Sequence, residues 1–380
     1  MIQNLINYFS NPQTRVLGFG YFGMSILFGS WASRIPDIQK ELNLNESDIG
    51  VALLGMSLGA FIMTFLAGML IEKFGTATSM IIGLFGMSSA LLLPALSTEL
   101  IWLFLALFLF GTFNGYLNIT VNNAVAEYEK QNNKVIMSTG HALFSIGAMT
   151  GAGLGTFFIK LEIPPIYHFI SIVMLVFLGS SLAYSQYKNL PEGKVEDQGF
   201  QMPSLAIVGL IIIGLCAMMG EGVVASWASI FLEVEKNIAP HLCPLAFTAF
   251  SGFMAIGRLF GDTLKEKIGS RSLLAVACAL GGSGIFLAIL SNSALLAILG
   301  FSITGLGYSV IVPIVFSMAA NTPGIKPTAG IAMVSGAGVL GFLGAPPLIG
   351  FISKFVSLSI GFALVAGFAY LALVVVLVKK

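Results

Sequence analysis

Two titratable side chains lie inside apolar stretches of this chain. Residues 214–231 read GLCAMMGEGVVASWASIF, and Glu221 is their only charged residue. A charge at bilayer depth costs several kcal/mol, so such residues mark ion or proton pathways. We predict that Glu221 carries protons; the alternative is a permanently protonated group or a hydrogen bond to a neighbouring helix. His141 is a second candidate for proton transfer, or else it bonds Glu127 or a backbone carbonyl.

A stripe of carboxamides forms the second candidate feature. Asn114, Asn118 and Asn122 recur every four residues, which places them on one face of a helix, with Asn123 beside them. Carboxamides both donate and accept hydrogen bonds, which suits hydroxyls, amides or zwitterions. Hydrogen bonds between helices, worth about 0.6–2 kcal/mol each, are the alternative role. We predict that the stripe lines a solute cavity, with Asn118 as its main contact.

Three aromatic residues are further candidates for solute contact. Trp227 lies six residues after Glu221 and either anchors the helix at the membrane interface or offers an apolar platform to a sugar-like ring. Trp31 raises the same choice in the first apolar segment. Tyr308 and Pro313 predict a bend in the tenth segment, as does the GAPPLIG stretch at 344–350 in the eleventh.

Three charged residues near the ends of apolar segments are candidates for gating. Arg258 and Asp262 are four residues apart in GRLFGD, which predicts a salt bridge that opens with an inner gate. Arg34 either pairs with an acid such as Asp37 at the outer rim or gates entry.

Composition places these residues in a membrane protein. Of 380 residues, 57% are hydrophobic and only 9% charged, whereas soluble domains carry about 25% charged residues. The net charge of +1 excludes a nucleic-acid footprint. Cys216, Cys243 and Cys278 fall on separate segments and predict neither a disulfide framework nor a metal site. The three histidines are scattered and no nucleotide-binding motif occurs, so we expect neither an enzyme nor a cofactor.

Twelve apolar segments are long enough to cross a bilayer, which takes about 20 residues each. We therefore expect an all-α membrane protein with an N-terminal six-helix bundle at 1–187, a cytoplasmic linker at 188–203 and a C-terminal six-helix bundle at 204–380. The predicted spans are 14–33, 47–71, 78–97, 100–126, 136–159, 165–187, 204–232, 242–264, 271–290, 292–320, 325–352 and 356–378.

Positive charge predicts the orientation of these spans. With the N-terminus inside, thirteen Lys and Arg residues fall in cytoplasmic segments and five in outer segments. This positive-inside bias places both termini in the cytoplasm. On that orientation Glu221 lies about 25 Å along its span, and it is the only acid deep in a predicted span.

The two halves repeat each other. GMLIEKFG at 68–75 matches DTLKEKIG at 262–269, and GHALFSIGAMTG at 140–151 matches GIAMVSGAGVLG at 330–341. The offsets of the two matches are nearly equal, which indicates duplication rather than coincidence. Two parallel six-span repeats are typical of one large group of transporters.

The chain resembles the major facilitator superfamily along its whole length. That family has a Gly-x-x-x-Asp-Arg-x-Gly loop, which here becomes Gly68, Glu72, Lys73 and Gly75. The second copy has Asp262 in place of the first glycine. The resemblance implies that Glu72 and Lys73 latch helix ends on the cytoplasmic side. The second copy retains Glu266, Lys267, Gly269 and Arg271.

Within that superfamily the chain resembles the MosC/YbjJ-like branch, relatives of the fucose permease type. The resemblance rests on GSWASRIPDIQKELNLNESDIG (29–50), NGYLNITVNNAVAEYE (114–129), GHALFSIGAMTGA (140–152), EGVVASW (221–227) and GRLFGD (257–262). The branch usually has acids where this chain has Asn118 and Ser226, so its coupling residues do not carry over directly.

These features together predict a secondary active transporter that works by alternating access. We expect proton-coupled import of a small polar solute such as a sugar, polyol or related amine. Drug or metabolite efflux by proton antiport is the alternative, and a non-transporting membrane sensor is a third. The expected partners are the solute, protons and the lipid bilayer. The resemblance implies a monomer in the bacterial cytoplasmic membrane.

Overall fold

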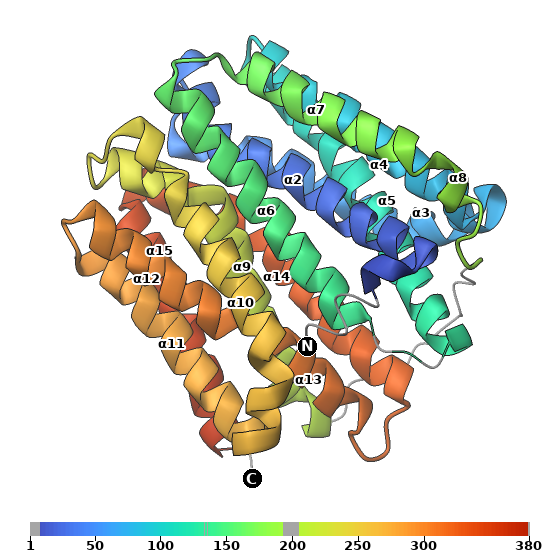
Figure 1. The fold of residues 1–380 in the computed structure, drawn as a ribbon. Coiled ribbons are helices and arrows are strands. Elements are labelled where there is room, and N and C mark those ends of the chain that lie inside the picture. Colours follow the sequence, from blue (N-terminus) through green and yellow to red (C-terminus); the bar gives the residue numbers. More distant parts are fainter. Residues whose placement is uncertain (1–7, 133, 135, 193–204, 379–380) are drawn as a thin grey trace. The chain divides into compact units, whose positions relative to one another are not determined.

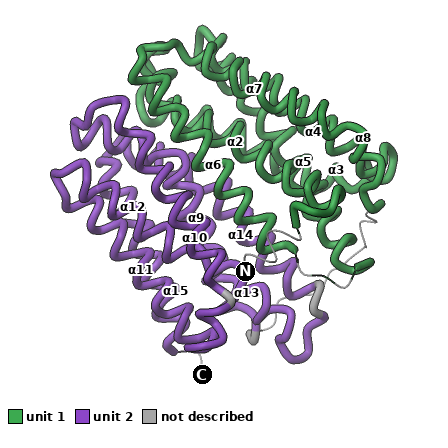
Figure 2. Tube along the Cα trace, in the orientation of Figure 1, with its two compact units in different colours: residues 1–195 green, residues 196–380 purple. Residues whose placement is uncertain are grey.

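The computed structural model describes residues 8–378 apart from 133, 135 and 193–204, and these residues form helices and turns without strands (Figure 1). They pack into two compact units, Met1–Val195 and Glu196–Lys380 (Figure 2). Most of the predicted linker at 188–203 lies outside the described residues, so its boundaries stay a prediction.

Six long helices and one short helix lie entirely within the described residues of unit 1. They are α2 (Pro12–Glu41), α3 (Glu46–Phe74), α4 (Thr76–Leu92), α5 (Leu100–Asn132), α6 (Met137–Lys160), α7 (Pro165–Leu182) and α8 (Tyr184–Tyr187), with a 3-10 turn at Pro94–Leu96. Unit 2 contains α9 (Leu205–Val234), α10 (Leu245–Ile268), α11 (Ser270–Leu290), α12 (Ala294–Tyr308), α13 (Ile311–Ala320), α14 (Pro327–Phe355) and α15 (Leu358–Val378), with a 3-10 turn at Pro240–Leu242.

The twelve predicted spans are confirmed. The described part of the chain holds twelve helical segments that are long and apolar enough to cross a membrane. Two helices run well past their predicted ends, because hydropathy marks the apolar stretch and not the helix: α2 continues to Glu41 and α5 to Asn132. In the tenth span, α12 and α13 are separated at Ser309 and Val310. Pro313 follows in the first turn of α13, where its missing N–H leaves no intrahelical bond unmade.

The two units share turn geometry at corresponding places. Gly75 joins α3 to α4 with φ of 76°, and Gly269 joins α10 to α11 with φ of 81°. Asn43 and Asn237, each in the loop that precedes one of these helices, both have φ of 51°. Each pair is 194 residues apart. The left-handed backbone suits glycine and asparagine, so the repeated sequence encodes a repeated structure.

Glycines let backbones touch along parallel helix pairs in both units. In unit 1, a Cβ on Gly151 of α6 would lie 2.2 Å from the carbonyl oxygen of Ile26 on α2. In unit 2, a Cβ on Gly222 of α9 would lie 2.4 Å from the carbonyl oxygen of Phe342 on α14. Small residues at helix contacts are a general way of packing helices within a bilayer. The close approach of α9 to α14 therefore depends on glycine, which has no side chain to separate the two backbones.

We predict that Gly341→Ala destabilises unit 2 while Gly344→Ala, one turn along α14, does not. A Cβ at 341 would lie 2.8 Å from the carbonyl oxygen of Leu215, whereas a Cβ at 344 meets nothing within 4 Å. Overpacking of this kind costs about 1–3 kcal/mol, and alanine in an open helical position gains up to about 1 kcal/mol over glycine. Thermal unfolding of the two purified variants in detergent measures the difference. Equal melting temperatures would contradict the packing described.

Candidate functional site

A polar cluster in unit 1 joins α2 to α5. The hydroxyl of Tyr21 donates to Oδ1 of Asn122 at 2.7 Å. Nδ2 of Asn122 in turn donates to the backbone oxygen of Asn118 at 2.8 Å and contacts Oδ1 of Asn118 at 3.2 Å. We call Tyr21, Asn118 and Asn122 the amide cluster. Asn118 is exposed, Asn122 is half-buried and Tyr21 is fully buried.

The amide cluster contains two residues of the predicted stripe, and the bond from Tyr21 of α2 to Asn122 of α5 is a hydrogen bond between helices, the alternative role for the stripe. Asn114 lies on α5 one turn before Asn118 and is half-buried. Tyr21 was absent from the sequence-based candidates, although a tyrosine hydroxyl in an apolar helix needs a partner. The ring of His141, on α6, lies 5.2 Å from the ring of Tyr21, centroid to centroid. The structure thus brings His141 next to the carboxamides, which the sequence placed on a different span.

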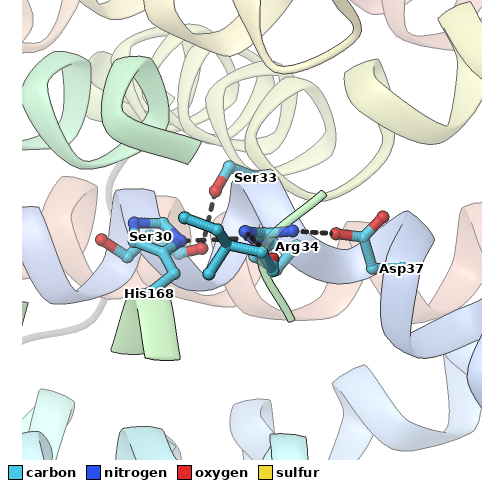
Figure 3. A network of polar contacts seen from close by, with 6 residues as sticks. Ser30, Ser33, Arg34, Asp37 and His168 are labelled. Atoms are coloured by element: carbon cyan, nitrogen blue, oxygen red, sulfur yellow. Dashed lines mark hydrogen bonds and ion pairs between the residues drawn. The ribbon is translucent and has the colours of Figure 1, made fainter. Parts of the chain in front are cut away.

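A buried arginine ties three segments of unit 1 together (Figure 3). Arg34 of α2 donates from Nη1 to Asp37 at 2.5 Å, from Nη2 to the carbonyl oxygen of Ile163 at 2.9 Å and from Nε to Nδ1 of His168 at 3.3 Å. His168 lies on α7, and Ile163 in the loop before it. Because Nδ1 accepts, the His168 ring is neutral and carries its proton on Nε2.

The Arg34 network corrects part of the sequence interpretation. The predicted ion pair with Asp37 is present, but the Arg34 side chain is only 3% exposed and does not lie at an open rim. The reason is that α2 continues for seven residues beyond Arg34. Trp31, one turn earlier, is 2% exposed. The Trp31 ring is therefore buried in this structure, and the roles predicted for it, interface anchor or platform for the solute, stay predictions.

In unit 2, Glu221 of α9 faces Arg258 of α10. Oε1 of Glu221 lies 3.7 Å from Nη2 of Arg258, and the two side chains are 17% and 10% exposed. Arg258 lies about 15 Å from the end of α10, deeper than the sequence suggested, because the helix extends to Ile268. The acid that the sequence left without a counter-ion therefore has one. The side chain of Asp262, the partner predicted for Arg258, lies outside the described residues.

Three consecutive residues of α9 contact three different helices. A Cβ on Gly220 would lie 2.4 Å from the Tyr308 ring on α12, while Gly222 faces a carbonyl of α14. Between them Glu221 faces α10. Successive residues of an α-helix are about 100° apart, so this glycine–glutamate–glycine stretch sits where α10, α12 and α14 surround α9.

Tyr308 and Trp227 are packing residues in this structure rather than open surfaces. Tyr308 is 3% exposed, and its ring lies between Gly220 and Gly281. Trp227 is fully buried, and its indole N–H donates to the carbonyl oxygen of Pro346 at 2.9 Å. In this structure the indole is buried and hydrogen-bonded, and the two roles predicted for Trp227 stay predictions. The indole ties α9 to the part of α14 where Pro346 and Pro347 interrupt the row of helical donors.

The repeated loops place charged residues at helix ends. Glu72 and Lys73 are exposed at the end of α3, and the ammonium of Lys73 lies 5.4 Å from the centroid of the Phe74 ring. The first N–H of α4, on Thr76, donates to Glu192 at 3.1 Å. In unit 2, Lys265 donates to Ser317 of α13 at 3.1 Å, and Arg271 donates to the carbonyl oxygen of Val376 at 3.0 Å. The last two contacts join helices of unit 2, α10 to α13 and α11 to α15.

The described residues contain no group of three or more potential metal ligands. What they offer is hydrogen-bond recognition in unit 1 and a charge pair in unit 2. Neither arrangement has a nucleophile held against a base. The chemistry available is therefore binding, charge compensation and proton exchange.

Comparison with known proteins identifies relatives along nearly the whole chain. An uncharacterized MFS-type transporter of Yersinia pestis is 28% identical over 349 residues, covering 91% of this chain and 90% of the relative. The uncharacterized transporter y4wD of Sinorhizobium fredii is 30% identical over 377 residues, covering 96% and 98%. The membrane protein MosC of Rhizobium meliloti is 27% identical over 345 residues, covering 90% and 84%.

Among solved structures, the nucleoside transporter NupG has a similar fold. Its TM-score is 0.68 at 14% identity, with 97% of this chain and 98% of that chain covered. A point variant of NupG gives 0.70 at the same identity, with 97% and 99% covered. The family model described as Major Facilitator Superfamily matches residues 17–201 and 210–380. Because that match takes in nearly all of both units, this multi-pass membrane protein belongs to the Major Facilitator Superfamily.

Proposed function

We propose that this transporter moves a small polar solute by alternating access and couples that movement to protons through Glu221. The observation that carries the proposal is the pair of Glu221 and Arg258, which lie 3.7 Å apart on different helices. Two unit charges at about 4 Å attract with an energy on the order of 4 kcal/mol at an effective dielectric constant near 20. Desolvation of both groups offsets much of this attraction.

The geometry of the pair suits exchange. A distance of 3.7 Å exceeds that of a charge-assisted hydrogen bond, about 2.7–2.9 Å, so the carboxylate has no close directional bond to Arg258. A proton taken up on a Glu221 oxygen removes the negative charge and releases the guanidinium from electrostatic attraction. Loss of the proton restores the attraction. Protonation would thereby change how strongly α9 is tied to α10.

The amide cluster supports a neutral polar solute. Asn118 and Asn122 are uncharged hydrogen-bonding groups, and Asn114 continues the same face of α5. We propose import of a sugar, polyol or related amine, in keeping with the resemblance to the MosC/YbjJ-like branch. NupG transports nucleosides according to its name; its 14% identity supports only the fold, but nucleosides also carry several hydroxyls and belong in a solute screen.

The remaining roles complete the proposal. The charged ends of α3 and α10, with Glu72, Lys73 and Asp262, would act in gating on the cytoplasmic side, and Arg258, deeper in α10, would take part through its pair with Glu221. His141 is placed to exchange protons near the amide cluster. The positive-inside distribution of Lys and Arg supports cytoplasmic termini, and the bacterial relatives support the cytoplasmic membrane of a bacterium. We propose a monomer as the functional form.

We predict that Glu221→Gln separates binding from coupling. The protein is reconstituted in proteoliposomes with an imposed pH gradient, and a pH indicator inside reports proton movement. The screen covers radiolabelled sugars, polyols, amines and nucleosides, together with fluorescent dyes. The wild-type protein should move protons only when its solute is present. Glu221→Gln should still exchange solute across the membrane but lose accumulation driven by the gradient. Solute-dependent proton movement that persists in Glu221→Gln would reject coupling through this residue.

The same screen distinguishes the alternatives. Movement of dyes in the direction opposite to proton flow, with no uptake of polar solutes, would favour efflux by proton antiport. Uptake of a polar solute at the same rate with and without the gradient would indicate a uniporter.

We also predict a double-mutant effect on stability. Glu221→Gln removes the negative charge that faces the Arg258 guanidinium and should destabilise the protein by about 1–3 kcal/mol, less than for a fully buried pair because both groups retain some exposure. The double variant Glu221→Gln/Arg258→Gln should regain part of this loss. Thermal unfolding in detergent at several salt concentrations measures both. Strictly additive losses would show that the two side chains do not interact.

A further inference from the structure

We infer that unit 1 recognises its solute through two hydrogen-bond donors, the N–H groups of the Asn118 side chain. Tyr21 and Asn122 fix the orientation of the Asn118 amide, so that its NH2 group and not its oxygen faces the solute. This inference rests on the proposed function, solute transport, and names the chemistry of the solute. The solute must present acceptor oxygens, as hydroxyl, carbonyl or carboxylate groups do. Tyr21 is a positioning residue in this scheme, and Asn118 is the contact.

The orientation of Asn122 follows from its neighbours. A backbone carbonyl oxygen can only accept, so the group of Asn122 that lies 2.8 Å from the Asn118 carbonyl must be its NH2. Its amide oxygen then points the other way, where the Tyr21 hydroxyl lies at 2.7 Å. This assignment depends on hydrogen-bond chemistry and not on telling nitrogen from oxygen. The tyrosine must therefore donate.

The hydroxyl of Tyr21 has one hydrogen and two nearby acceptors. The sulfur of Met137 lies 3.2 Å away, but an amide oxygen is a much stronger acceptor than a thioether. The ring cannot easily move, because Tyr21 is fully buried and a Cβ on Gly140 would lie 2.4 Å from its Cε2. Tyr21 is thus a fixed donor that locks Asn122 in one of its two amide orientations.

Asn122 passes this polarity to Asn118. The NH2 group of Asn122 also contacts Oδ1 of Asn118 at 3.2 Å, so the amide oxygen of Asn118 faces Asn122. The nitrogen of Asn118 then faces away from the cluster, and it donates to no residue in the described part of the chain. Because Asn118 is exposed, its two N–H groups are accessible to a ligand. An approaching solute therefore meets donors at this position.

The first test of these amide orientations uses two isosteric substitutions. Asn122→Asp replaces the donating nitrogen by oxygen next to the Asn118 carbonyl, so the two acceptors repel each other. Asn118→Asp keeps the oxygen that faces Asn122 and changes only the exposed group. We expect the melting temperature of Asn122→Asp to fall by several degrees at pH 8 and to recover in part at pH 5, where a protonated carboxyl group can donate again. Asn118→Asp should melt close to the wild type.

Equal losses for the two variants, or a larger loss for Asn118→Asp, would overturn the assigned polarity. Tyr21→Phe keeps the ring and removes only the donor. It should lower the melting temperature less than Asn122→Asp does, because the amide oxygen of Asn122 loses a partner without gaining a repulsive one. This stability series requires no solute, so it remains decisive if transport itself is never detected.

The second test measures binding by the purified full-length protein in the absence of a pH gradient. The probes are radiolabelled mannitol, glucose and uridine, which carry acceptor oxygens, and tetraphenylphosphonium, which carries none. We expect at least one of the first three to bind, and Asn118→Leu to weaken that binding about tenfold, equivalent to about 1.4 kcal/mol. Tyr21→Phe should weaken it about threefold, and in proteoliposomes should raise KM without changing kcat. Tetraphenylphosphonium binding should not change in either variant.

Three outcomes would each reject donor recognition by Asn118. They are binding of only tetraphenylphosphonium, no binding of any probe, and full affinity of Asn118→Leu for mannitol, glucose and uridine. Gly344→Ala is the matched control, since it lies in the other unit and its added Cβ would meet nothing within 4 Å. It should bind the probes and couple transport to protons as the wild type does. Loss of proton coupling in Glu221→Gln tests the proposed function. Loss of probe binding in Asn118→Leu tests this inference.

Discussion

The need to compensate charge inside apolar helices constrains unit 2 most strongly. Neither Glu221 nor Arg258 could remain ionised at that depth alone without a large desolvation penalty. Because the two side chains lie 3.7 Å apart on α9 and α10, each charge offsets part of the desolvation penalty of the other. The pair also fixes how α9 is rotated, because Glu221 can face α10 only if Gly220 faces α12 and Gly222 faces α14. A charge requirement therefore determines the packing of four helices.

The glycines on either side of Glu221 make this arrangement possible. A side chain at 220 would collide with the Tyr308 ring, and one at 222 with the carbonyl oxygen of Phe342. Larger residues would push α12 and α14 away from α9. The indole of Trp227 holds the same α9–α14 contact further along, through the carbonyl oxygen of Pro346. Because these contacts involve backbone atoms and rigid rings, α9 has little freedom to rotate without moving its neighbours.

The sequence predicted the spans and the repeat because both are local properties. Hydropathy marks each apolar stretch, and the loops ending at Gly75 and Gly269 share the residues that the left-handed turn requires. The stripe of Asn114, Asn118 and Asn122 follows from the helical period alone. The partners of these residues could not be predicted. The stripe marks a polar face of α5 and Arg258 marks one of α10, but a pattern within one helix does not show that these faces meet Tyr21 of α2 or Glu221 of α9.

The pair of Arg34 and Asp37 differs from the pair of Glu221 and Arg258 in a way that suggests different tasks. Arg34 and Asp37 belong to one helix, lie 2.5 Å apart and share Arg34 with a backbone carbonyl and a neutral histidine. Loss of one of these bonds would leave the others in place, as befits a static clamp. Glu221 and Arg258 belong to different helices and lie beyond hydrogen-bond distance. A single proton is enough to abolish their attraction. A pair in unit 2 that one proton can open, together with a clamp in unit 1 that keeps its other bonds, is the asymmetry that the proposed proton coupling requires.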